Sequence, residues 1–217
     1  MIHPTAIIDE EHGPVVIGGC THVGPYSVIR GPVTIGSGCQ IHSHVVIGEP
    51  GESATHYSMD SPIIIENDVT LRERVTVQRG LGPGYDNHGK RRHTLIESGA
   101  YIMHGCHIAH DVLVAANAVL APRVVLGGHS NVLEGAYMGI GSMTHQFVTV
   151  GALAMVGMGA VANYDVMQLD KVVGVPARKI GMNSVGRERS GADHKQLQEW
   201  LERYRLLAMR PAKGDNR

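Results

Sequence analysis

The sequence predicts an all-β fold, a parallel β-helix followed by a short C-terminal α-helix. First, an aliphatic residue recurs at every sixth position, a period that fits neither the 3.6-residue turn of a helix nor simple alternation along one strand. Second, 28 glycines and only 4% aromatic residues suit narrow stacked layers joined by tight corners. Third, helical spacing of apolar residues is found only near the end of the chain.

The six-residue pattern occupies three segments. The first consists of Ile2, Ile8, Ile17, Val23, Ile29, Ile35, Ile41 and Ile47. The second consists of Ile65, Leu71 and Val77. The third consists of Ile96, Ile102, Ile108, Val114, Leu120, Leu126, Val132, Met138, Thr144, Val150 and Val156, of which only Thr144 is not aliphatic. If three units make one triangular coil, residues 18 apart stack, and the aliphatic side chains form interior columns at the strand spacing of about 4.8 Å.

Two interruptions break the pattern. Residues 49–62 suggest a loop or a modified coil, and a segment rich in glycine and charge predicts a protruding loop over about residues 79–95. Solenoid proteins place such insertions on one face, often near a binding surface, although a solvated surface excursion is an equal alternative. Beyond residue 172 we expect the chain to leave the coil in extended form, because Pro176 cannot donate to a strand ladder.

The C-terminal segment predicts an amphipathic helix. Asp193 and Gln196 form a variant of the capping box that begins a helix. Apolar residues then recur at helical spacing: Leu197, Trp200, Leu201, Tyr204 and Leu207. We therefore expect a β-helix domain over residues 1–185 and a helix over residues 190–210, docked on its own coil or on a neighbouring subunit.

Composition excludes several classes of protein. With 19 Lys and Arg against 20 Asp and Glu, the chain has no general attraction for nucleic acid or anionic membranes. Cys20, Cys39 and Cys106 form no CxxC motif, so neither a disulfide framework nor a structural zinc site is expected. No apolar stretch approaches the roughly 20 residues of a membrane-spanning helix, and no signal peptide is evident. We expect a cytoplasmic protein without membrane insertion.

The histidines are the candidate catalytic residues. His104 and His110 occupy equivalent positions on adjacent faces of one coil, so they should not share a metal ion within one subunit. A metal site between subunits, or histidines that only decorate a polar surface, remain alternatives. Acid–base catalysis fits better, because His110, Gly128 and Gln146 are 18 residues apart and His129 lies beside that column. A glycine there lets its backbone N–H approach a developing oxyanion.

Several motifs resemble one family of enzymes. They are His-Ile-Ala-His-Asp at 107–111, Leu-Gly-Gly-His at 126–129, His-Gln-Phe at 145–147 and Asn-Ser-Val-Gly-Arg-Glu-Arg at 183–189. Together with the hexapeptide repeat, the opening Ile-His-Pro-Thr-Ala-Ile and Val-Thr-Val-Gln-Arg-Gly at 75–80, they resemble the UDP-N-acetylglucosamine O-acyltransferases of lipid A biosynthesis.

The resemblance implies a left-handed β-helix assembled as a homotrimer, with active sites in the clefts between subunits. By position it implies that His110 is the general base, Asp111 its partner and the Gly128 amide the oxyanion donor. The substrate-binding residues that it implies are His107, His129, His145, Gln146 and Arg189, the last for a phosphate. Met158 falls where the family sets acyl length by side-chain bulk, which predicts a short or medium acyl chain.

The chain also departs from that family. Residues 48–61 lack the glutamine–aspartate pair and the lysine that meet the sugar nucleotide, and Gln78, also a candidate for substrate binding, replaces a histidine. Residues 173–179 resemble the end of hexapeptide acetyltransferases that use coenzyme A, with Arg178 and Lys179 available for its phosphates. We therefore expect an acyl thioester of acyl carrier protein or coenzyme A as co-substrate and no tightly bound cofactor. The acceptor would be a hydroxyl or amine of a sugar nucleotide or related amino sugar.

Two other functions stay open. A zinc protein of the γ-class carbonic anhydrase type would use His104 and its neighbours, but the chain lacks the histidine that this class carries a few residues upstream. A trimeric scaffold without catalytic activity is the other alternative.

Overall fold

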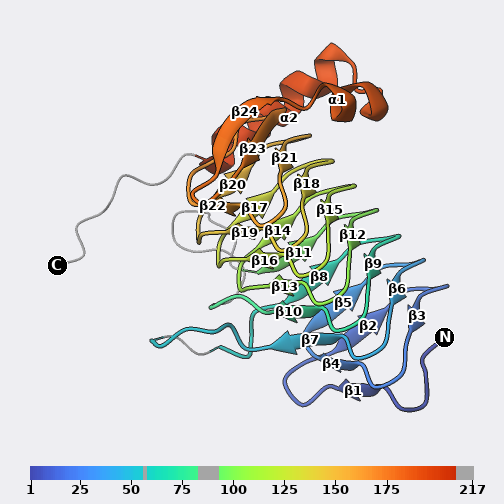
Figure 1. Cartoon of the computed structure of the whole chain (residues 1–217). Coiled ribbons are helices and arrows are strands. Elements are labelled where there is room, and N and C mark those ends of the chain that lie inside the picture. The colour runs from blue at the N-terminus through green and yellow to red at the C-terminus, as the bar shows by residue number, and fades with distance from the viewer. Residues whose placement is uncertain (56–57, 83–92, 209–217) are drawn as a thin grey trace.

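The computed structural model describes residues 1–55, 58–82 and 93–208, and these form a three-sided coil of short strands with two helices at its C-terminal end (Figure 1). In the described residues the strands form three sheets. The first contains β1 (Ile7–Asp9), β4 (Val28–Arg30), β7 (Val46–Glu49), β10 (Thr76–Gln78), β13 (His107–Ile108), β16 (Val125–Leu126), β19 (Met143–Thr144) and β22 (Val161–Ala162). The second contains β2 (Val15–Ile17), β5 (Val33–Ile35), β8 (Ile63–Ile65), β11 (Thr94–Ile96), β14 (Leu113–Val114), β17 (Asn131–Val132) and β20 (Thr149–Val150). The third contains β3 (His22–Val23), β6 (Gln40–Ile41), β9 (Thr70–Leu71), β12 (Tyr101–Ile102), β15 (Val119–Leu120), β18 (Tyr137–Met138), β21 (Met155–Val156), β23 (Asp170–Val173) and β24 (Arg178–Met182).

The predicted parallel β-helix is confirmed, and so is its stacking register. Ile108 pairs with Leu126 and Leu126 with Thr144, each 18 residues further along the chain. The aliphatic positions of the third segment are buried in the interior. Thr144 is tolerated there because its hydroxyl bonds to the Ser130 hydroxyl at 3.1 Å and accepts the Gly127 N–H at 3.2 Å.

Two of the three cysteines are packing residues. Cys39 and Cys106 are buried in the core and Cys20 is exposed, and all three are free thiols. Burial raises the pKa of Cys106 to about 11, so its thiol is protonated at neutral pH.

Both interruptions of the repeat leave the coil at the same corner, between the first and second sheets. Residues 50–62 connect β7 to β8, and residues 79–93 connect β10 to β11. The second connection ends at His93, because Thr94 already begins β11, and its middle part, 83–92, lies outside the described residues. Its first residue, Arg79, is fully buried rather than protruding. The turn that follows β13 emerges at this corner as well, which brings both insertions beside it.

The chain leaves the coil differently from the expectation. β23 still pairs parallel with β21, and the chain then folds back so that β24 runs antiparallel to β23. Two helices follow, α1 (Ser184–Ser190) and α2 (His194–Ala208), where one was predicted. The capping box of α2 is confirmed: the Gln196 N–H donates to Asp193 Oδ1 at 2.8 Å, and the Asp193 N–H donates to Gln196 Oε1 at 3.3 Å. Helix α1 was missed because its seven residues bury no side chain and so carry no apolar period.

Helix α2 docks on the coil of its own chain. Its apolar stripe, which includes Trp200, Leu201 and Tyr204, packs with Leu113 and Leu133 of the coil. Beside this contact the Arg203 guanidinium bonds to Glu97 Oε1 at 2.6 Å and to Glu134 Oε1 at 2.5 Å. No helix in the described parts of the chain is long and apolar enough to cross a membrane.

Replacement of Arg203 should therefore loosen the docked helix. Arg203→Met leaves two partly buried carboxylates without their cation, and we expect a loss of about 1–3 kcal/mol in the free energy of unfolding by urea. Arg205→Met is the matched control, because within the described residues Arg205 pairs only with the exposed Glu202 on the same helix, and its loss should cost at most about 0.5 kcal/mol. Equal losses in the two variants would contradict the docking role.

Candidate active site

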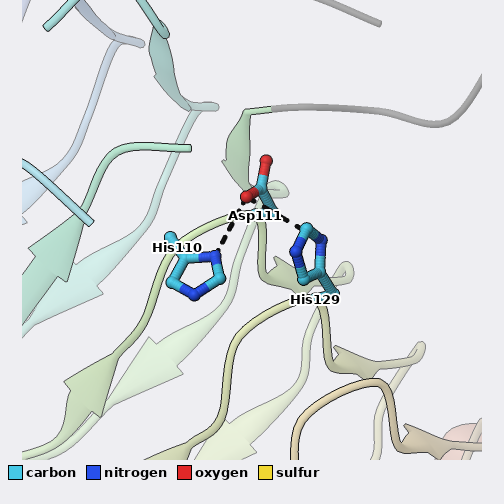
Figure 2. Close-up of side chains that lie close together, drawn as sticks. All are labelled: His110, Asp111 and His129. Carbon is cyan, nitrogen blue, oxygen red and sulfur yellow. Dashed lines mark hydrogen bonds and ion pairs between the residues drawn. The ribbon is translucent and has the colours of Figure 1, made fainter. Parts of the chain in front are cut away.

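His110 and Asp111 form a close pair at the corner after β13 (Figure 2). Adjacent residues of an extended strand point to opposite faces, so such a pair needs a bend in the backbone. Asp111 supplies it with a φ of 59°, and its Oδ2 lies 3.0 Å from His110 Nδ1. The carboxylate is fully buried, and the imidazole side chain is 12% exposed, so the pair is shielded while one edge of the ring stays accessible.

His129 approaches the same carboxylate from the next coil. Its Nδ1 lies 3.8 Å from Asp111 Oδ2, and its ring meets the His110 ring edge-on, with centroids 5.0 Å apart (Figure 2). The backbone ties the two corners together, because the His129 N–H donates to the His110 carbonyl at 3.0 Å. On its other side the His129 ring stacks on Phe147, with centroids 4.6 Å apart. Three successive coils therefore contribute to one cluster.

Gly128 lies directly against the His110 ring. A Cβ at position 128 would be 2.4 Å from His110 Cε1 and 2.5 Å from Nε2, distances that no side chain can occupy. Only glycine lets the imidazole lie over the backbone there. Among the described residues, no group accepts a hydrogen bond from the Gly128 N–H, so this donor is available beside the ring.

The surroundings of Asp111 keep its carboxylate ionised. Burial raises the pKa of Asp111, but the hydrogen bond from His110, the nearby His129 and the Leu81 N–H, 3.2 Å from Oδ2, together lower it below its usual value. An ionised carboxylate only accepts hydrogen bonds, so Nδ1 of His110 donates. The neutral ring then carries its lone pair on Nε2, the nitrogen beside Gly128.

A pocket of about 170 Å³ lies on the outer face of the first sheet, next to this cluster. Its lining residues are Val46, Glu49, Glu52, Thr76, Val77, Gln78 and His107. His107 Nδ1 lies 2.8 Å from Thr76 Oγ1, and Gln78 Oε1 accepts the Glu52 N–H at 3.3 Å. Burial lowers the pKa of His107, with a smaller opposing effect from Glu52. The predicted substrate residues Gln78 and His107 therefore share one pocket.

The other predicted residues are more dispersed. His145 and Gln146 are exposed on the corner one coil beyond Gly128, next to Phe147, whose N–H donates to the Gly128 carbonyl. Met158 is 76% exposed and lies on the corner between the third and first sheets. Arg189 is exposed on α1. Within one chain these last two residues are not part of the His110 cluster.

Three contacts of the cluster were not predicted, those of Phe147, Gly51 and Leu81. Phe147 is the only phenylalanine of the chain and belongs to the His-Gln-Phe motif, so the sequence could have predicted it as a residue of the site. Gly51 could not be predicted, because its closeness to His110 depends on the path of the first insertion: a Cβ at position 51 would lie 2.7 Å from His110 Cβ. A long-range contact of this kind leaves no periodic signal.

The cluster also has donors that suit a metal ion. One donor atom each of His110, Asp111 and His129 lies within 4.8 Å of the others, and two imidazoles with one carboxylate are a common ligand set for transition metals. His104, by contrast, is exposed on the corner between the third and first sheets, away from His110. The expectation that these two histidines point in different directions is confirmed.

Comparison with known proteins identifies the family of the chain. The family model described as bacterial transferase hexapeptide (six repeats) matches residues 14–49 and 93–128, two segments of the coil. A UDP-N-acetylglucosamine O-acyltransferase of Syntrophobacter fumaroxidans is 36% identical, over 95% of this chain and 84% of the relative. One from Halorhodospira halophila is 32% identical, over 95% and 83%. The structure of LpxA from Acinetobacter baumannii superposes with a TM-score of 0.74 at 29% identity, covering 98% of this chain and 86% of that one. The chain belongs to the UDP-N-acetylglucosamine O-acyltransferase family, as the motifs predicted.

A methyl group at Gly128 should displace the His110 ring. We expect Gly128→Ala to fold, because the position is at a corner, and to lose roughly 100-fold in kcat/KM, the cost of moving a reacting group by about 1 Å. Gly19→Ala is the matched control, since a Cβ at this other corner would meet nothing within 4 Å. Steady-state kinetics checks both variants, and an unchanged kcat/KM in Gly128→Ala would contradict the geometry.

The lowered pKa of His107 predicts how stability depends on pH. As the pH falls, the unfolded chain binds a proton at this histidine near pH 6.5, and the folded protein binds it only at a lower pH. The neutral, buried His107 therefore makes its full contribution to the free energy of unfolding above about pH 6.5. Its contribution is lost as the pH falls through the lower pKa of the folded state. Urea unfolding between about pH 7 and pH 5 should therefore show a smaller loss of stability in His107→Gln than in the wild type. Equal losses would refute the shift.

Proposed function

We propose that the protein transfers an acyl group from a thioester to a hydroxyl of UDP-N-acetylglucosamine or a closely related sugar nucleotide. The observation that carries this proposal is the His110–Asp111 pair lying against Gly128 at the corner where both insertions emerge. A shielded imidazole, an ionised partner and an available backbone N–H are the groups that acyl transfer requires. Membership of the family supports the same reaction.

In this mechanism His110 acts first as a base. Nε2 takes the proton from the acceptor hydroxyl, and the oxygen attacks the carbonyl carbon of the thioester. Asp111 stabilises the imidazolium that forms, since its carboxylate stays ionised. The Gly128 N–H donates to the oxyanion of the tetrahedral intermediate. When the intermediate collapses, the carbon–sulfur bond breaks and His110 returns the proton to the sulfur.

The remaining candidate residues bind the substrates in this proposal. The pocket of Gln78 and His107 holds part of the acceptor, because it lies next to the base and presents several hydrogen-bonding groups. His129, His145 and Gln146, which lie on the same corner as the base, contact the substrates, and Arg189 binds a phosphate. Met158 and Arg189 reach a substrate only if a second subunit supplies them, which fits a cytoplasmic homotrimer with sites between subunits.

The donor in this proposal is an acyl-acyl carrier protein, the donor for which the curated relatives are named. Coenzyme A is the alternative, and neither is a tightly bound cofactor. We also propose that Met158 restricts the acyl group to short or medium length by its bulk. A long 3-hydroxyacyl donor should then react better with Met158→Gly than with the wild type, while a short donor reacts equally well with both. Equal use of long and short donors by the wild type would refute this restriction.

His110 is the residue whose loss tests the reaction. We expect His110→Gln to reduce kcat roughly 100-fold to 10,000-fold, the usual contribution of a general base, while the oligomeric state is unchanged. His22→Gln is the control, because His22 is exposed on β3 of another sheet and should keep full turnover. Acyl transfer from the carrier protein to UDP-N-acetylglucosamine, followed by mass spectrometry, measures both. Full turnover in His110→Gln would end the proposal.

A zinc-dependent hydratase is the second candidate, favoured only by the donor set of His110, Asp111 and His129. Metal analysis of the purified protein and an assay of carbon dioxide hydration separate it from the transferase. A bound zinc ion with hydratase activity, and without acyl transfer, would favour it.

A further inference from the structure

Arg79 is a fully buried cation just after β10, and its guanidinium binds backbone carbonyls from three other segments. Nε donates to the Gly48 carbonyl at 2.7 Å, and Nη2 donates to the Arg30 and Gly31 carbonyls at 3.1 and 3.0 Å. Nη1 donates to the Met59 carbonyl in the first insertion. The single side chain therefore fixes the start of the second insertion to Met59 in the first insertion, to the strand that precedes that insertion and to the end of β4.

Both insertions touch the catalytic pair where Arg79 holds them. In the second insertion, the Leu81 N–H donates to Asp111 Oδ2 at 3.2 Å, the same oxygen that binds His110. In the first insertion, Gly51 packs tightly between His110, Leu81 and the Arg79 backbone. A Cβ at position 51 would lie 2.7 Å from His110 Cβ, 2.8 Å from Leu81 Cδ2 and 3.1 Å from the Arg79 carbonyl oxygen. Arg79 is thus one contact away from each member of the pair.

A guanidinium is a costly group to bury, so a packing role alone is a poor explanation for it. Removing a charge from water is unfavourable unless its hydrogen bonds are replaced, and here four backbone carbonyls replace them. The planar fork of arginine can bind several carbonyls at once, which a lysine ammonium cannot do in the same geometry. The arginine therefore gives the two insertions a defined position relative to each other.

We propose that Arg79 is a positioning residue for acyl transfer, which holds the Leu81 amide and the Gly51 backbone against the Asp111–His110 pair. The inference rests on the proposed function, because it requires that His110 and Asp111 perform the reaction. Without Arg79 the Leu81 N–H leaves Asp111, the carboxylate gains freedom to rotate, and the His110 ring is no longer held with Nε2 toward the substrate.

A double-mutant cycle tests this inference. Arg79→Lys should lower kcat/KM roughly 10-fold to 100-fold in the otherwise wild-type enzyme, measured with the acyl carrier protein thioester and UDP-N-acetylglucosamine. In an Asp111→Asn background the same change should alter kcat/KM less than about twofold, because residues that act through one group are not additive. An equal factor in both backgrounds would overturn the inference.

A control variant and a second test variant distinguish a positioning role from a general loss of stability. Thr94→Val removes a buried hydroxyl at the other end of the second insertion, where it donates to the Gln78 carbonyl at 2.6 Å, so any effect on kcat/KM should be the same in both backgrounds. If Arg79→Lys fails to fold, Leu81→Pro removes the N–H that reaches Asp111 and should show the same dependence on Asp111.

A measurement without turnover distinguishes failure of this inference from failure of the proposed function. The nitrogen resonances of His110 in ¹⁵N-histidine spectra should shift in Arg79→Lys or Leu81→Pro and stay unchanged in Thr94→Val. Unchanged His110 resonances in a folded Arg79→Lys or Leu81→Pro protein would refute the positioning role. Full turnover in Asp111→Asn and His110→Gln, by contrast, would refute the proposed function itself.

Discussion

The stacking of one coil on the next, 18 residues along the chain, is the constraint on which the rest of this structure depends. It places a glycine over a histidine, Gly128 on His110, and it brings His129 to the carboxylate of Asp111. Neither contact follows from neighbours in the sequence. Because each interior strand of the ladder is hydrogen-bonded to the coils on both sides, the register cannot slip by one residue without turning the aliphatic columns outward.

The corners of the coil bring the polar side chains of the cluster together. Asp111, His129 and Phe147 occupy the same corner of three successive coils, with φ values of 59°, 58° and 65°, a region that side chains seldom adopt. At Asp111 that backbone turns the carboxylate back toward the preceding histidine. The cost of each strained residue is of order 1–3 kcal/mol, and the surrounding ladder supplies the stability that maintains it. The repeat therefore provides a rigid surface, and the positive φ values at its corners set the positions of the polar groups.

The parts that the sequence predicts are the ones that repeat. The spacing of His110, Gly128 and Gln146 predicted their common column, and the six-residue period predicted the parallel coil, because both depend only on counting residues. The capping box at Asp193 was readable because helix ends have a local chemical signature. Helix α1 carries no apolar stripe, and it was therefore not predicted.

The parts that escaped prediction depend on how the insertions fold over the coil. The contacts that bury Arg79, the contact of Gly51 with His110 and the hydrogen bond from Leu81 to Asp111 join residues 20 or more positions apart with no fixed spacing between them. A charged segment rich in glycine suggests solvent exposure, and Arg79 is the exception because four backbone carbonyls replace its water. These contacts had to come from the structure.

The protonation of the His110 ring is the centre of this account. If the ionised Asp111 fixes the proton on Nδ1, then Nε2 carries the lone pair that removes a proton from the acceptor. The tautomer of His110 in the wild-type protein, assigned from ¹⁵N-histidine NMR at neutral pH, tests this most directly. The account predicts a protonated Nδ1 and a bare Nε2; a proton on Nε2 with a bare Nδ1 would contradict it.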